Sequence, residues 1–120
     1  MKLAISSQGD NLDALIDPRF GRAKNFIVVN PETYEFEVIE NKQNLNLPQG
    51  AGIQSGKTIV DNDVDALITG NCGPKAFHVL SAGGVKVYIG ENGTIKQAID
   101  RFKNGKLQAA NSPNVEGHWV

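Results

Sequence analysis

One cysteine stands where a thiol could meet an anion or a metal. Cys72 lies in the loop Asn71-Cys72-Gly73, between a short apolar run and Pro74. Pro74 suits the first turn of a helix, because its missing N–H would have no partner there. The free N–H groups and the dipole of such a helix start favour anions and thiolates. Together with Lys75 they predict a partly accessible Cys72 with a lowered pKa; the alternative is an inert, buried cysteine.

Two arginines form a second group of residues that could bind a ligand. Arg19 and Arg22 lie in the segment Asp17-Pro18-Arg19-Phe20-Gly21-Arg22-Ala23. Their fork-shaped guanidinium groups are suited to clamp an anion. The alternative is a surface pair neutralised by Asp13 or Asp17. The connection that carries them, residues 8–24, is long, and long loops in compact domains are usually functional or mobile.

The remaining candidates for catalysis are few. His78 falls on the flank of its predicted helix away from the apolar stripe, which favours a solvated histidine, whereas His118 and Trp119 lie in the tail, where nothing anchors an argument. The chain has no Walker loop, no pair of CxxC motifs, no HExxH and no Gly-x-Ser-x-Gly. We therefore expect no catalytic residues and a protein that is not an enzyme.

Apolar patterning predicts the elements that must position these loops. Strands are expected at 2–6, 26–29, 34–41, in the apolar run from Val64 to the residue before Gly70, and at 85–89, with helices at 51–61 and 74–82. A third helix is marked by a capping box of Thr94 and Gln97 and by Gly105 as its stop. This order predicts an α/β fold whose five-stranded mixed sheet has the order 3-2-1-4-5, with the second strand antiparallel.

The predicted topology brings the candidate loops together. Strands one and four lie side by side with connections that diverge, which is a switch point where ligands bind. We expect one end of the sheet to hold Ser7, Gln8, Arg19, Gly52, Asn71 and Cys72. The strand order is that of ribonuclease-H-like folds, whose nucleases hold two metals with carboxylates on central strands. Here strand one offers Ala4 and Ser6, so hydrolytic nuclease activity is not expected.

Composition narrows the class of protein. The 120 residues fit one domain, expected at 1–107, with a loosely ordered tail at 108–120. A net charge of −1 without a basic stripe argues against a nucleic-acid partner. One cysteine makes no internal disulfide, Met1-Lys2 leads directly into a strand-like segment, and no apolar run approaches membrane-spanning length. We therefore expect a cytoplasmic protein that does not bind membranes.

Three spaced motifs carry a family resemblance. They are the Asp17–Ala23 segment, the stretch Asp65-Ala66-Leu67-Ile68-Thr69-Gly70-Asn71-Cys72-Gly73-Pro74-Lys75-Ala76, and Gly90-Glu91-Asn92-Gly93-Thr94-Ile95. Together they resemble the dinitrogenase iron–molybdenum cofactor biosynthesis family, which includes NifX, NafY, the C-terminal part of NifB and small stand-alone proteins. The similarity runs from Met1 to about Leu107. It implies a ribonuclease-H-like three-layer fold and a carrier or scaffold for an anionic metal–sulfur cluster of the iron–molybdenum or iron–sulfur type.

The resemblance also implies where that cluster would bind. The implied cofactor-binding residues are Arg19, Arg22, Asn71, Cys72, Gly73 and Lys75, with Cys72 as the metal ligand and cluster-assembly proteins as partners. Building an iron–sulfur cluster on thiolates normally takes about four cysteines. A preassembled cluster brings its own sulfides and needs only one soft anchor, cations and N–H groups. Two alternatives stay open: a module for a small anionic metabolite, and a protein-interaction domain without a ligand.

Overall fold

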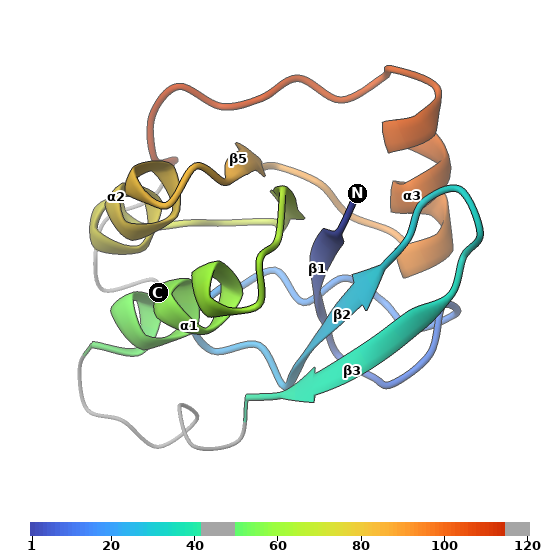
Figure 1. The fold of residues 1–120 in the computed structure, drawn as a ribbon, viewed down its shortest axis with the longest axis horizontal. Helices are drawn as coiled ribbons and strands as arrows, with labels where there is room; N and C mark the ends of the chain where they lie inside the picture. The colour runs from blue at the N-terminus through green and yellow to red at the C-terminus, as the bar shows by residue number, and fades with distance from the viewer. Residues whose placement is uncertain (42–49, 115–120) are drawn as a thin grey trace.

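A five-stranded mixed sheet forms the centre of the protein (Figure 1), seen in a computed structural model that describes residues 1–41 and 50–114. Its order is β3-β2-β1-β4-β5, with β2 antiparallel to both neighbours and β4 parallel to β1 and β5. The predicted order and direction are therefore confirmed. The strands are β1 (Leu3–Ser7), β2 (Asn25–Val29), β3 (Phe36–Glu40), β4 (Ala66–Ile68) and β5 (Lys86–Tyr88).

Three helices cover the two faces of the sheet and complete a ribonuclease-H-like, three-layer α/β fold, as predicted. The helices are α1 (Ala51–Asp61), α2 (Pro74–Ala82) and α3 (Ile95–Lys103). Figure 1 shows α1 and α2 side by side and α3 apart from them. Gly56 lets the first two helices approach closely, since a Cβ there would lie 3.0 Å from Cγ1 of Val79.

Alternate side chains of the central strands point to opposite faces of the sheet and belong to two separate hydrophobic cores. Ala4, Val28 and Leu67 pack with α1 and α2, whereas Leu3, Ile5 and Ile68 pack with α3. All five residues of β1 and of β2 are buried. Such runs are typical of strands covered on both faces, which is why they read as nearly continuous apolar segments.

The third helix begins as its sequence predicts. Gln97 N–H donates to Oγ1 of Thr94 at 3.1 Å, and Thr94 N–H donates to Oε1 of Gln97 at 2.9 Å, so the capping box is complete. Gly105 follows with a φ of 69°, the left-handed conformation that favours glycine at a helix stop. The predicted start and stop of this helix are both confirmed.

The edge strands are shorter than predicted. β3 begins at Phe36 rather than at Tyr34, because Tyr34 has a φ of 65° and donates its N–H to the Asn30 carbonyl in the turn before the strand. β5 covers three residues, and its outer edge receives a hydrogen bond from Ala110 N–H to the Val87 carbonyl at 2.7 Å. Within the described ranges, no helix is long and apolar enough to cross a membrane.

Candidate functional site

The connection that carries Arg19 and Arg22 (residues 8–24, the arginine loop) is hydrogen-bonded to Asn71-Cys72-Gly73 (the cysteine loop) at the carboxyl ends of β1 and β4. We call the two together the joined loops. Asn71 N–H donates to the Pro18 carbonyl at 2.7 Å, and Phe20 N–H donates to the Asn71 carbonyl at 3.2 Å. Arg19 therefore lies opposite Asn71 in a short parallel bridge. Gly70 allows this contact, since a Cβ there would lie 2.8 Å from Cα of Pro18.

The other residues predicted for this end of the sheet lie there as well. Ser7 ends β1 and is followed by Gln8, whose N–H donates to the Leu15 carbonyl. Gly52 lies in the first turn of α1, and Ser55 of the next turn donates its hydroxyl to the Gly21 carbonyl at 3.3 Å. The start of α1 is thus placed against the arginine loop, and the predicted convergence is confirmed.

Buried polar groups of the protein itself occupy the predicted switch point between β1 and β4. The Ser6 hydroxyl lies 2.8 Å from both the Asp17 carbonyl and the Thr69 hydroxyl, and Ser6 and Thr69 are fully buried. These hydrogen bonds satisfy the polar groups between the strands. A ligand at this end would therefore meet the outer surface of the joined loops rather than the gap between the strands.

The buried side chain of Asp17 holds the backbone of the arginine loop. Asp17 is only 7% exposed, and its Oδ1 accepts the N–H of Arg19 at 3.0 Å. Burial raises the pKa of Asp17, while the N–H and charge of Arg19 and the N–H of Lys24 act against that rise. The sequence suggested Asp17 only as a partner that neutralises the arginines; the structure adds its role in holding their backbone.

The cations differ in their surroundings. Arg19 and Lys75 are exposed, whereas Arg22 is half-buried and has partners within the chain. Among the described residues, no side chain caps the start of α2, where Gly73 is the residue before the helix and Pro74 lies in the first turn. The structure therefore brings Arg19, Asn71, Gly73 and Lys75 to one end of the molecule, next to a helix start that favours negative charge.

Cys72 contradicts the prediction of an accessible thiol with a lowered pKa. Cys72 is 0% exposed and belongs to the core that includes Phe20 and Ala76. Burial raises the pKa of Cys72 to about 12. The loss of hydration outweighs the helix start and Lys75, because the thiol is enclosed in the core while Lys75 is exposed. In this conformation Cys72 is a protonated, buried thiol.

One residue of this end was missed by the sequence analysis. Asn114 accepts the Cys72 N–H at Oδ1 and donates from Nδ2 to the Gly70 carbonyl at 3.2 Å and to Oδ1 of Asn71 at 3.1 Å. The only signal was the turn-forming composition of Asn111-Ser112-Pro113-Asn114, which gives no long-range partner.

One of the two histidines lies in the part of the chain that the structure describes. His78 is exposed on α2, as predicted, while His118 and Trp119 lie outside the described residues. Within residues 1–41 and 50–114, no group of three or more His, Cys, Asp or Glu side chains could hold a metal ion. Arg19, Lys75 and the backbone N–H groups at the start of α2 are groups at this end that suit an anion.

The sheet order, its three layers and the joined loops define a small α/β domain of ribonuclease-H-like topology. The chain matches the family described as "Dinitrogenase iron-molybdenum cofactor" over residues 1–105, and it belongs to that family. A curated relative, "Uncharacterized protein MJ0580" of Methanocaldococcus jannaschii, is 35% identical over 111 residues, 90% of each chain.

Two solved structures are also similar to this chain. The apo form of the orange protein from Desulfovibrio gigas is 40% identical, with a TM-score of 0.92 over 95% of this chain and 96% of that one. A Thermotoga protein proposed to be NifB is 38% identical, with a TM-score of 0.81 over 97% and 98% of the two chains. At these levels of identity the likeness covers sequence as well as fold.

Proposed function

We propose that this protein is a cytoplasmic, non-catalytic carrier that binds a preassembled, anionic metal–sulfur cluster at the joined loops. The cluster would be of the iron–molybdenum or iron–sulfur type and would pass to or from cluster-assembly proteins. Family membership supports this proposal. The observation that carries it is the pairing of Pro18 and Phe20 with Asn71, which fixes the two motif-bearing loops side by side.

The charges at this surface suit an anionic cluster. Arg19 and Lys75 would offset its negative charge, and Arg22 would support them from its half-buried position. Backbone N–H groups near Gly73 and Lys75, together with the side chain of Asn71, would donate to its sulfides or oxygens. A cluster that brings its own sulfides fits this donor set, because one thiol cannot assemble an iron–sulfur centre.

Ligation by Cys72 stays a prediction with a condition attached. A thiol with a pKa of about 12 is not a thiolate at neutral pH, and thiolates are the form that binds metals. Cys72 would have to leave the core before it could coordinate a metal. The proposed binding therefore rests on the cations and N–H groups, and Cys72 would act only after a rearrangement.

Anaerobic incubation with a preformed iron–sulfur or molybdenum–iron–sulfur cluster tests this function. Metal retained after gel filtration is compared for wild type, the double variant Arg19→Ala, Lys75→Ala, and the control Lys57→Ala, Lys86→Ala, which removes two exposed cations elsewhere. Wild type and control are expected to retain the cluster equally. The Arg19, Lys75 variant should bind about tenfold or more weakly, and the difference should shrink as salt is added.

The variant Cys72→Ala separates charge from ligation. Retention close to wild type would support binding by cations and N–H groups. If Cys72→Ala abolishes retention while the loss of Arg19 and Lys75 changes nothing, the charge-based proposal is overturned in favour of thiol ligation. If no form retains metal and wild type binds a phosphorylated metabolite instead, the carrier function is wrong.

A further inference from the structure

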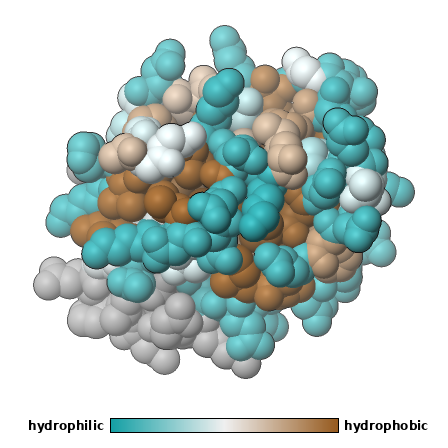
Figure 2. Space-filling view, viewed as in Figure 1, coloured by the Kyte–Doolittle hydropathy of each residue, from teal (hydrophilic) through white to brown (hydrophobic). Residues whose placement is uncertain are grey.

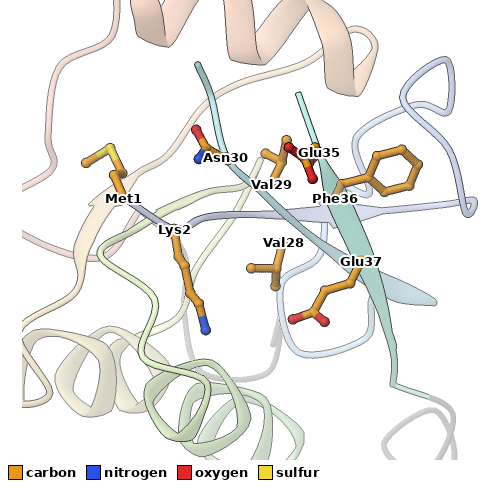
Figure 3. Close-up of a pocket in the computed structure, with 8 residues that line it drawn as sticks. All are labelled: Met1, Lys2, Val28, Val29, Asn30, Glu35, Phe36 and Glu37. Atoms are coloured by element: carbon orange, nitrogen blue, oxygen red, sulfur yellow. The ribbon is translucent and has the colours of Figure 1, made fainter. Parts of the chain in front are cut away.

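A pocket lies at the end of the sheet opposite the joined loops. It has a volume of about 420 Å³ and is lined by Met1, Lys2, Val28, Val29, Asn30, Glu35, Phe36 and Glu37. These residues come from the starts of β1 and β3 and the end of β2 (Figure 3). Figure 2 shows apolar surface over the β2–β3 part of the molecule with hydrophilic residues around it. The proposed function does not use this surface.

The pocket adjoins the edge strand β3, some of whose backbone groups are unpaired within residues 1–41 and 50–114. Asn30 N–H donates to the Glu35 carbonyl, and Asn41 N–H donates to the Lys24 carbonyl, so within the register of β2 and β3 the odd-numbered residues of β3 face β2. The N–H and C=O groups of Phe36 and Val38 must then point outward. They have no hydrogen-bond partner among the described residues.

The opposite edge of the sheet differs in this respect. On β5, the Val87 carbonyl accepts the Ala110 N–H at 2.7 Å, so the chain itself covers part of that edge. On β3, Phe36 is 41% exposed, and its ring points outward past the strand in Figure 3. An exposed edge with unpaired backbone groups is a template for the addition of another strand.

The negative charge of the glutamates on and near β3 favours a basic strand at this edge. Residues 25–41 contain four glutamates and no lysine or arginine. Glu35 and Glu37 are exposed at the pocket and have no salt-bridge partner in the described part of the chain. Lys2 does not neutralise them, because its ammonium group donates to the Asn62 carbonyl at 3.1 Å and points toward α1 in Figure 3. A second copy of β3 would bring the same carboxylates together, so self-pairing is disfavoured.

We propose that the β3 edge binds an extended, basic segment of a partner protein as a sixth strand. Its backbone would pair with Phe36 and Val38, its lysines or arginines would extend over the pocket to Glu35 and Glu37, and its alternate apolar side chains would lie on the other face of the sheet, beside Phe36. The surface is remote from the joined loops. A partner could therefore dock here while those loops remain open to a ligand.

A peptide titration followed by NMR of the labelled protein tests this docking surface. The probe is a synthetic peptide of alternating lysine and valine, with alternating glutamate and valine as the matched control. Only the basic peptide is expected to bind, with the largest shifts at the amides of Phe36 and Val38 and with affinity that falls as salt rises. The same basic peptide N-methylated at alternate residues should lose binding, because it cannot pair along the edge.

Charge reversal provides the second arm of the test. The double variant Glu35→Lys, Glu37→Lys should weaken the basic peptide at least tenfold and gain binding of the acidic one, while Glu32→Lys in the preceding turn changes affinity less than twofold. Largest shifts at the joined loops, equal binding of both peptides, or unchanged binding of the N-methylated peptide would each overturn the proposal. So would a dimer of the free protein built on β3. None of these outcomes depends on cluster binding.

Discussion

The side chain of Asn114 holds the backbone of Cys72 from 42 residues further along the chain. Its Oδ1 accepts the Cys72 N–H at 2.9 Å, and the backbone N–H of Asn114 donates to the Cys72 carbonyl at 3.3 Å. Cys72 is thereby fixed on both sides of its α-carbon. A movement of the Cys72 backbone that brings the thiol out of the core must break these contacts.

Replacing Asn114 should therefore make Cys72 more reactive. The variant Asn114→Ala removes side-chain hydrogen bonds worth about 0.5–1.5 kcal/mol each. A change of one or two kcal/mol is roughly a 5–30-fold change in the population of an open state, so the alkylation rate of the native thiol should rise by about that factor. Mass spectrometry of iodoacetamide-treated protein measures the rate, and Asn111→Ala, an exposed residue of the same segment, is the control. An unchanged rate for Asn114→Ala would show that the thiol opens by another route.

Gly70 controls the contact between the two loops. A Cβ at this position would lie 2.8 Å from Cα and 2.9 Å from the carbonyl oxygen of Pro18, both backbone atoms that cannot rotate away. We expect Gly70→Ala to lower the free energy of unfolding by about 1–3 kcal/mol and to shift the NMR signals of Arg19 and Asn71.

The comparison for this variant is Gly90→Ala. Gly90 has a φ of 80° but nothing within 4 Å of an added Cβ, so only backbone strain of about 1 kcal/mol is expected there. Chemical denaturation measures both variants. Equal losses, with no shifts in the arginine loop, would contradict the importance of close packing at Gly70.

Most of the fold was readable from local patterns. Thr94, Gln97 and Gly105 act within one helix, and the apolar runs of β1 and β2 report burial on both faces, so nearby residues carry the information. The topology then placed Arg19 and Asn71 at the same end of the sheet, since the carboxyl ends of neighbouring parallel strands meet at one edge. These features need no knowledge of distant side chains.

The errors concern contacts set by tertiary packing. A loop position before a helix suggested an accessible Cys72, but the backbone direction at one residue turns its thiol into the core. Asn114 was missed because its partners, Gly70 to Cys72, are more than 40 residues away and no sequence period links them. The edge position of β3 follows from the predicted strand order, whereas its pocket depends on residues from three parts of the chain.

Asp17 gives a pH-dependent prediction at low pH. Because burial raises its pKa in the folded state, the stability that Asp17 contributes is full below its ordinary pKa of about 3.9 and is lost as the pH rises through the folded value. The variant Asp17→Asn keeps an acceptor oxygen but cannot ionise. The stability of wild type relative to this variant, measured by urea unfolding, should therefore fall as the pH rises above the ordinary carboxyl pKa. Asp13→Asn, at an exposed carboxylate, corrects for the loss of one charge; a relative stability that rises with pH would refute the argument.

Cys72 gives the corresponding prediction at high pH. Its pKa is raised to about 12 in the folded protein by burial, while an unfolded thiol ionises near its ordinary value of 9.0. The folded state therefore keeps a proton that the unfolded state releases, so the stabilisation is full below about pH 9 and decreases as the pH rises toward the folded pKa. The slope contributed by this thiol is at most about 1.4 kcal/mol per pH unit. Unfolding free energies of wild type and Cys72→Ala, measured from pH 7.5 to 10.5, isolate it from the lysines and tyrosines common to both. The difference between the two proteins should be flat below pH 8.5 and then move steadily against wild type. A flat difference across the whole range would mean that the thiol ionises equally in both states, and Cys72 would then be as available to a metal as its position before α2 first suggested.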